Sequence, residues 1–256
     1  MIKFFRHIRK QLVSENKFSK YLLYAIGEII LVVIGILIAI KINAYNTEKD
    51  TIRTITNQLE NVALELKGNL ALIDKSIAKS SAIIESSRSL ANAISMNQEL
   101  TSNEQSVLLG ATLAPVLNYQ PNTVILNEMI STGNIRNINQ TDLKLLLLDF
   151  GSRFADIENQ ESLHAEDQKA CTDYLLTHGD FKAVMDDTGV TKQYMSLELS
   201  KNRLGNNALM SSKEFENKLL IFMASGINLE EDNYKPFKTY LESMINYIEL
   251  ELENYD

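Results

Sequence analysis

Residues 21–40 read YLLYAIGEIILVVIGILIAI, an apolar run with a single charged side chain, Glu28. Because an α-helix rises about 1.5 Å per residue, this run is long enough to cross the hydrocarbon core of a bilayer, which is about 30 Å thick. A helix inside a soluble protein is rarely apolar on every face. The run is also longer than the apolar region of about 7–15 residues in a cleaved signal peptide. We therefore predict a membrane-spanning anchor helix over residues 21–42.

The residues before the span are basic, whereas those after it are acidic. The basic residues are Lys3, Arg6, Arg9, Lys10, Lys17 and Lys20. Because positively charged flanks stay in the cytoplasm, residues 1–20 are expected there, either setting topology alone or also lying against anionic lipid headgroups. The whole chain carries a net charge of -8, so residues 43–256 are strongly acidic. We expect them on the other side of the membrane, which in a bacterium is the periplasm.

The span belongs to a longer patterned stretch, residues 5–43. The sequence ENKFSKYLLYAIGEI at residues 15–29 is followed by VVIGILIA at residues 32–39. This stretch resembles the opening of a large uncharacterised family of single-pass membrane proteins from Bacteroidota. A looser likeness includes an SxGNIRxI motif at residues 131–138. The resemblance implies a bacterial inner-membrane protein, and it supplies no catalytic residues.

The rest of the chain is predicted to be helical. It has 3 Pro and 10 Gly, whereas average usage gives about 13 and about 18 for this length, and helix interiors exclude both residues. The fold class is therefore all-α, with one N-terminal transmembrane helix continuing into a long stalk and a periplasmic helical bundle. The stalk has apolar residues at three- and four-residue steps: Ile52, Ile55, Leu59, Val62 and Leu66. This spacing fits a coiled coil between chains and packing within one chain equally well.

Capping and breaking residues divide the bundle into helices. We predict a helix at residues 104–117, which Pro115 kinks or ends early, and one at 121–129, closed by Gly133. A long helix is predicted at 142–177, capped by Thr141 and stopped by Gly179. Two more are predicted, one from a Ser211–Glu214 capping box to residue 227 and one at 233–252. Residues 178–205 are expected to form a loop with short helical pieces. The acidic runs at residues 186–187 and 230–232 are interpreted as solvated turns.

Glu28 is the residue of greatest functional interest, because a carboxyl group inside a bilayer is costly unless it is paired or faces water. Gly27, Leu31, Gly35 and Ala39 recur at four-residue steps beside it. Gly35 and Ala39 form a small-xxx-small pair, and small residues such as Gly27, Gly35 and Ala39 let two helix backbones approach closely. Three interpretations remain open: Glu28 bonds one helix to another, it is tolerated near the cytoplasmic interface, or it relays protons or ions in a larger complex. Our hypothesis is assembly.

Catalytic, metal and cofactor sites are not indicated. Glu161 and His164 form a Glu-x-x-His pair, but a di-iron bundle needs a second pair and two more glutamates. His164, Cys171 and His178 share a helix face, but each step of seven residues is about 10.5 Å, too far for two ligands of one metal ion. Cys171 at helical spacing is more typical of a small core residue than of a nucleophile. We therefore expect no enzyme, no cofactor and no metal, and the negative charge argues against a nucleic-acid partner.

The functional prediction is a membrane-anchored periplasmic interaction or scaffold protein that self-associates or binds another envelope protein. One alternative is a ligand-binding sensor-like domain that acts through a membrane partner, since the residues before the span are too few for an output domain. Another is an ion-coupled accessory subunit that uses Glu28. A final series of tyrosines fits either an interface or ordinary bundle packing: Tyr234, Tyr240, Tyr247 and Tyr255.

Overall fold

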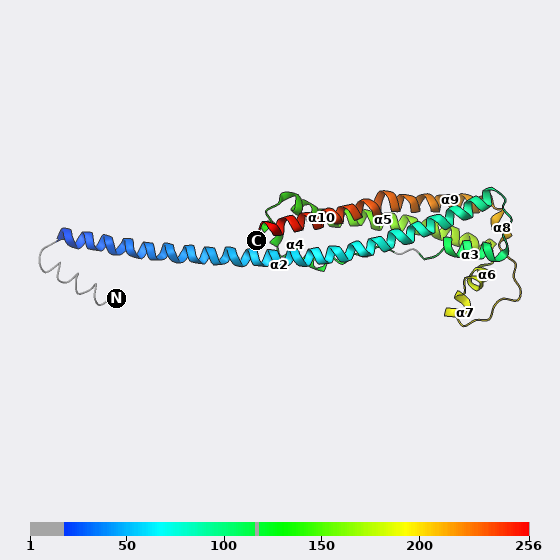
Figure 1. Ribbon diagram of the computed structural model, residues 1–256, viewed down its shortest axis with the longest axis horizontal. Helices are drawn as coiled ribbons and strands as arrows, with labels where there is room; N and C mark the ends of the chain where they lie inside the picture. The colour runs from blue at the N-terminus through cyan, green and yellow to red at the C-terminus, as the bar shows by residue number, and fades with distance from the viewer. Residues whose placement is uncertain (1–17, 116–117, 256) are drawn as a thin grey trace. The chain divides into compact units, whose positions relative to one another are not determined.

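The computed structural model describes residues 18–115 and 118–255 (Figure 1). The structure is 83% helical, and its described residues contain no strand, which confirms the all-α fold class. The roles predicted for Lys3, Arg6, Arg9, Lys10 and Lys17, and for the side chain of Lys20, lie outside the described residues. The chain divides into two units, residues 1–56 and 57–256. The domain boundary predicted after residue 42 stays a prediction.

Helices α2 and α5 are the longest elements. In chain order the structure has α2 (Phe18–Ser95), α3 (Ser102–Thr112), α4 (Val124–Ser131), the 3-10 helix η1 (Asn134–Asn137), α5 (Thr141–His178), α6 (Phe181–Asp187), α7 (Val190–Tyr194), α8 (Asn207–Met210), α9 (Lys213–Asn228), the π-helix η2 (Leu229–Tyr234) and α10 (Lys235–Glu253).

The first unit contains the apolar part of α2. By length and composition α2 is a candidate membrane span, and none of its most apolar window is buried. Leu31 is 69% exposed and Leu37 is 59% exposed. A helix with apolar side chains exposed on all sides needs a surrounding apolar phase, because soluble surfaces rarely expose such large apolar areas. The predicted long apolar helix near the N-terminus is therefore confirmed, whereas its topology stays a prediction.

The second unit is built from three long helical legs. Two contacts fix the direction of residues 57–95. Lys67, toward the start of this segment, pairs with Glu249 of α10 (3.0 Å). Ser95, at its end, donates to Glu216 of α9 (2.6 Å). These residues of α2 therefore run antiparallel to the α9–η2–α10 leg. Helix α5 packs against the same leg, and Figure 1 shows α9 and α10 following one another beside it.

Residues 57–95 of α2 and helix α5 run in the same direction, so the chain returns along the unit between them. This return leg consists of α3, an irregular stretch, α4 and η1. Pro115 and Pro121 explain the irregular stretch, because proline lacks an N–H group and disfavours helix in the residue before it. Helix α3 accordingly ends at Thr112, earlier than residue 117, and α4 starts at Val124 rather than Pro121.

Side chains of the long helices bind the backbone of the return leg. The carboxylate of Glu65 accepts hydrogen bonds from the N–H groups of Ile125 (2.9 Å) and Leu126 (3.2 Å), where α4 begins. Asn69 bonds both the N–H (2.8 Å) and the carbonyl (2.7 Å) of Asn122. Buried backbone groups need such partners where regular secondary structure does not supply them. The irregular stretch and the start of α4 are thus held by side chains of α2, where helical bonds are missing.

The apolar stripe predicted in the stalk packs inside the chain. Leu59, Val62 and Leu66 are completely buried, so intrachain packing accounts for this part of the stripe. Further along, α2, α3, α5 and α9 share one apolar cluster, which includes Leu90, Leu109, Cys171, Phe215, Leu219 and Phe222. The bundle therefore has a continuous core between its helical legs.

Two predicted helix starts are wrong by one residue. The cap of α9 is Ser212, whose hydroxyl accepts from the N–H of Phe215 (3.2 Å), and not Ser211. Thr141 is the first residue of α5 and not its cap, and Gln140 at the cap position makes no side-chain capping bond. Glu251 of α10 binds the backbone just before the helix, where it accepts from the N–H groups of Asn139 (2.5 Å) and Gln140 (3.2 Å).

The prediction of a solvated turn at residues 230–232 is also wrong. The helical leg continues through π-helix η2, and Glu230 is only 6% exposed. Its carboxylate accepts from the Ser81 hydroxyl (2.7 Å) and pairs with Lys235 (3.0 Å). These partners make burial of the carboxylate tolerable. The π-helical turn lies just before Pro236, whose ring would otherwise crowd the preceding helical turn.

The prediction of a solvated turn at residues 186–187 is wrong as well. Asp186 is 8% exposed, pairs with Lys182 and accepts from the Ser200 N–H (2.8 Å). Asp187 pairs with Arg203. The two aspartates at the end of α6 therefore bind the loop between α7 and α8.

The Glu251 contact yields a stability prediction. Glu251→Ala leaves the N–H groups of Asn139 and Gln140, just before α5, without their acceptor, so we expect the free energy of unfolding to fall by about 1–3 kcal/mol. Glu249→Ala is the matched control on α10, because Glu249 is exposed and forms a surface ion pair that contributes about 0–1 kcal/mol. Chemical unfolding of the full-length protein in mild detergent, followed by circular dichroism, measures both. Equal effects of the two substitutions would contradict this role of Glu251.

Candidate functional site

Glu161 lies inside the bundle and binds parts of the protein itself. The residue is 6% exposed. Its Oε1 atom accepts hydrogen bonds from the Tyr119 N–H (2.7 Å) and from the Tyr234 hydroxyl (2.6 Å). Burial raises the pKa of the Glu161 carboxyl, and these two bonds oppose the rise. Glu161 thus links α5 to the return leg and to η2, which is a structural use of a carboxylate.

His164 follows one turn later on α5 and is 3% exposed. Its Nδ1 atom lies 2.9 Å from the Ser225 hydroxyl, and its ring stacks on Phe222 with centroids 4.6 Å apart. Gly226 makes room for the ring, since an added Cβ would lie 2.9 Å from the imidazole Cε1. Burial lowers the pKa of the imidazole. Glu161 and His164 therefore both take part in packing and hydrogen bonds between α5 and the α9–η2 leg.

Cys171 and His178 lie in different surroundings. Cys171 is completely buried in the apolar cluster, and burial raises the pKa of its thiol to about 12. This confirms the interpretation of Cys171 as a small core residue. His178 is exposed and stacks on Tyr174 at 4.2 Å between centroids. Within the described ranges, no group of three or more His, Cys, Asp or Glu residues is placed to hold a metal ion.

The tyrosines of the last helical leg divide into two sets. Tyr234 and Tyr240 are buried, at 0% and 6% exposed, and Tyr255 donates to Glu251 (2.6 Å). These three take part in bundle packing. Tyr247 instead lines a surface groove. The sequence alone left both interpretations open, and bundle packing accounts for Tyr234, Tyr240 and Tyr255.

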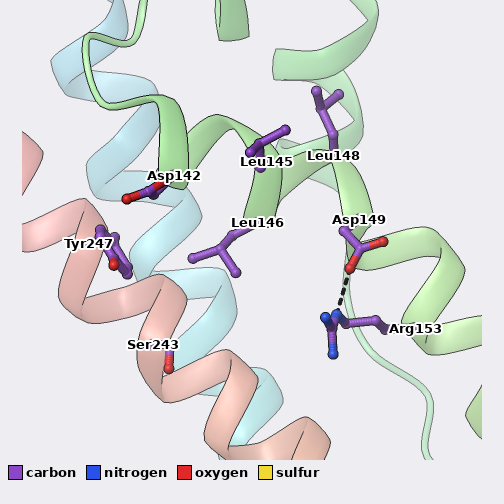
Figure 2. A pocket seen from close by; sticks show the side chains of 8 residues that line it. All are labelled: Asp142, Leu145, Leu146, Leu148, Asp149, Arg153, Ser243 and Tyr247. Atoms are coloured by element: carbon purple, nitrogen blue, oxygen red, sulfur yellow. Dashed lines mark hydrogen bonds and ion pairs between the residues drawn. The ribbon is translucent and has the colours of Figure 1, made fainter.

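The groove lies between α5 and α10 and has a volume of about 640 Å³ (Figure 2). Its lining residues are Asp142, Leu145, Leu146, Leu148, Asp149, Arg153, Ser243 and Tyr247. Leu145 is 60% exposed and Leu148 is 54% exposed. The groove therefore offers apolar side chains to solvent between two helices, with acidic groups at its edge.

Arg153 is fixed at one end of the groove. Its Nε atom donates to the Asp149 carboxylate at 2.6 Å, a contact visible in Figure 2. Its guanidinium carbon also lies 4.6 Å from the centre of the Tyr240 ring, a cation–π geometry that favours this position. Arg153 thus borders the groove and is positioned by both Asp149 and Tyr240.

The sequence analysis missed Leu145 and Leu148 as candidate surface residues, although the sequence carries a signal. Residues 145–148 are four consecutive leucines. Four consecutive positions span more than a full helical turn, whereas the core-facing stripe of a helix covers only part of its circumference. Leu143 and Leu147 are completely buried, so the others are forced toward the surface. A leucine run longer than one face indicates an exposed apolar site.

The predicted helix-packing residues in the span meet no described neighbour. Nothing lies within 4 Å of a Cβ atom built on Gly27 or on Gly35 in the described part of the chain. Glu28 is half-buried. This small-residue face leaves space for a second backbone to approach, and the roles of Glu28, Gly27, Gly35 and Ala39 in assembly stay predictions.

These features define a class: an all-helical protein with one candidate membrane span that continues into a bundle held by buried carboxylates. The chain belongs to a family of unknown function, DUF6090, whose model matches residues 28–165. The match starts in the candidate span and reaches through the return leg into α5. It confirms the resemblance to an uncharacterised family. No curated protein matches the chain, and no solved structure matches it.

The two tyrosines around Glu161 yield a paired prediction. Tyr234→Phe removes a donor from a buried carboxylate, so the free energy of unfolding should fall by about 1–3 kcal/mol. The Tyr119 side chain is equally buried, but its hydroxyl has no hydrogen-bond partner within the described part of the chain. Tyr119→Phe should therefore be neutral or stabilising. Chemical unfolding of both variants in the same detergent measures this, and a larger loss for Tyr119→Phe would refute the assignment.

His164 yields a pH prediction. Because its pKa in the folded protein is lowered below the ordinary value of about 6.5, the unfolded chain takes up a proton that the folded chain resists. The contribution of His164 to stability is complete above about pH 6.5 and declines as the pH falls below it, by at most about 1.4 kcal/mol per pH unit. The free energy of unfolding of wild type minus that of His164→Gln should decline in this way. A difference that stays flat as the pH falls would contradict this role of His164.

Proposed function

We propose that this protein is a membrane-anchored scaffold that binds other proteins of the bacterial envelope, including further copies of itself. The α5–α10 groove carries this proposal. Leu145 and Leu148 are more than half exposed there, and Tyr247 also lines the groove. Exposed apolar side chains that gather in one place, with a polar edge, are typical of protein-binding surfaces.

Charge supports the proposed location. The basic residues before the span favour a cytoplasmic N-terminus at the inner membrane and contact with anionic headgroups. The acidic residues after the span suit the opposite side, and this supports the proposed location of the helical bundle in the periplasm. The groove then faces the compartment in which envelope proteins meet.

The span provides the proposed contact between copies. Gly27, Gly35 and Ala39 let two backbones approach, and Glu28 lies on the same helix where a hydrogen bond between helices is favourable in lipid. Open space at Gly27 and Gly35 supports this arrangement. A scaffold with one contact in the membrane and another in the bundle joins copies and partners at separate sites.

The interior of the bundle supports an interaction role over catalysis or ligand sensing. Glu161 and His164 are the buried titratable groups whose spacing is most typical of a chemical site. Both are bound by side chains or backbone of the same chain. Groups engaged in this way hold helices together, so the surface is where this protein meets other molecules.

The test is the mass of the full-length protein extracted in mild detergent from its native membrane, with all co-purifying chains identified. Wild type should exceed the mass of one chain, 28.9 kDa, after correction for detergent. Leu148→Lys places a charge in the groove and should remove any stoichiometric partner protein, because burying an unpaired charge is costly. Glu28→Ala should reduce the number of copies, because it removes the proposed contact in the span.

Leu176→Lys is the matched control, because Leu176 also lies on α5 and is 55% exposed, as against 54% for Leu148. It should leave the mass and the partner unchanged. A wild-type protein that purifies as a single chain without partners would refute the scaffold proposal. An unchanged mass for Glu28→Ala would refute the role of the span.

A further inference from the structure

Helix α2 continues beyond its apolar run as a stalk whose side chains are exposed. We define the stalk as residues 41–54, which read KINAYNTEKDTIRT. Residues 41–50 and 52–54 are all exposed, and α2 is helical through the whole stretch. Exposure over so many consecutive positions means that the described part of the chain leaves this length of helix uncovered.

The stalk sequence is poorly suited to a helix that is covered by water alone. Asparagine, threonine and aspartate, all of low helix propensity, fill six of its positions. The hydroxyls of Thr47, Thr51 and Thr54 each donate to the carbonyl four residues earlier (3.0, 2.8 and 2.9 Å), a contact that slightly destabilises a helix. Most helical stability in proteins comes from packing of an apolar face. The stalk therefore needs a packing partner.

The large apolar residues of the stalk lie on one stripe with heptad spacing. Ile42 is 58% exposed, Tyr45 is 65% exposed and Ile52 is 36% exposed. Together with Lys49 they follow one another at steps of three, four and three residues. Ile42 and Lys49 then occupy heptad positions a, and Tyr45 and Ile52 occupy positions d, which is the seam of a coiled coil.

The same heptad frame runs back through the apolar run of α2. Because α2 is one uninterrupted helix, its a and d positions there belong to the same seam: Glu28, Leu31, Gly35 and Ile38. The seam ends after Ile52, since Leu59, the next apolar residue of this frame, is completely buried in the bundle. The apolar run and the stalk thus share one continuous surface for a second helix.

Charges beside the seam fit a second copy of the same chain. Glu48 is at a heptad position g, and Arg53 is at the following position e. In a parallel pair of helices, the g residue of one chain faces the next e residue of the other. Residues five apart on a single helix do not face each other. Each copy therefore presents an acid and a base that face their opposites across a parallel pair in register.

The membrane anchor favours this parallel arrangement. Copies that are anchored by the same sequence share one orientation, so their stalks start at the same bilayer surface and run in the same direction. Ile42, Tyr45 and Ile52 then each meet their own counterpart. Lys49 is the single polar residue among the seam positions of the stalk, a device that specifies register and number of strands at a cost in stability.

We propose that two copies of this chain pair in parallel along the seam, as a left-handed coiled coil that begins in the span and continues through the stalk to Ile52. This inference rests on the proposed function, because it names the surface through which copies of the scaffold meet. The stalk adds what the span lacks. Lipid provides no hydrophobic driving force for helix association, whereas burial of isoleucine and tyrosine from water does.

The test is disulfide cross-linking of single added cysteines in the full-length protein in its native membrane, followed by electrophoresis without reductant. Ile42→Cys, Tyr45→Cys and Ile52→Cys should give at least about threefold more covalent dimer than Thr47→Cys, because Thr47 is at position f, away from the seam. Thr47 is exposed, so its thiol is equally open to oxidant. Protein without an added cysteine gives the background from Cys171, which is completely buried.

Charge reversal tests the parallel register in the Tyr45→Cys protein. Glu48→Arg should lower the dimer yield by about twofold or more, because positions g and e then carry like charges. Adding Arg53→Glu should restore the yield, since each contact regains opposite charges. Asp50→Arg is the matched control, because it makes the same change of charge at position b, outside the seam, and should leave the yield unchanged. Circular dichroism checks that the variants keep the helical fold.

Equal dimer yields at positions 45 and 47 would overturn the proposal, and so would a charge reversal that Arg53→Glu does not rescue. A covalent adduct whose mass is not that of two chains would mean that another protein covers the seam, and it would overturn the proposal as well. A detergent mass above that of one chain, with flat yields along the stalk, would overturn this inference and leave self-association through the span standing. The groove is tested separately by Leu148→Lys.

Discussion

The backbone of the return leg is the constraint on which the bundle depends. Residues 57–95 of α2 and helix α5 run in the same direction, so the chain must travel back between them. Pro115 and Pro121 keep part of that path out of a helix. A buried peptide group without a partner costs about 1–3 kcal/mol, and the neighbouring helices supply the partners. Asn69, Glu161 and Glu251 each bind backbone of this leg or of the segment that follows it. Two long helices can therefore run parallel, because side chains of the neighbouring helices supply hydrogen bonds to the irregular backbone that connects them.

The buried carboxylates of the bundle and His164 have partners within the protein and hold its helices together. Glu161 and His164 have the spacing of a chemical site, yet each is bonded within the core and each has a pKa shifted toward its neutral form by burial. The same logic holds for Asp186, which binds a loop backbone. The polar groups inside the bundle thus maintain the shape. Leu145 and Leu148 are apolar residues exposed on the outside, in the α5–α10 groove, and they are the feature on which the proposed interaction role rests.

Particular residues show which features of the fold can be predicted from local sequence patterns. The helix over residues 141–178 follows from its periodicity and from Gly179, because both act within one or two turns. Ser211 was predicted to cap α9, whereas Ser212 caps it. The Oγ of Ser212 also lies 2.7 Å from the Tyr174 hydroxyl of α5, a contact that local sequence does not reveal. Glu230 has the surroundings of a turn along the chain, but Ser81, far away in sequence, gives its carboxylate a partner. Leu145 and Leu148 were open to inference, since four consecutive leucines exceed one helix face.

The sequence by itself determined the helical class, the apolar run of α2, the helix breaks at the prolines and the resemblance to an uncharacterised family. These properties depend on composition and on periodicity within a few residues, so no distant contact is needed to infer them. The tertiary structure decided which carboxylates are buried, which leucines are exposed and how the return leg is held. Those outcomes depend on side chains separated by tens to hundreds of positions along the chain, and a buried charge is stable only where folding brings its partner within hydrogen-bond distance.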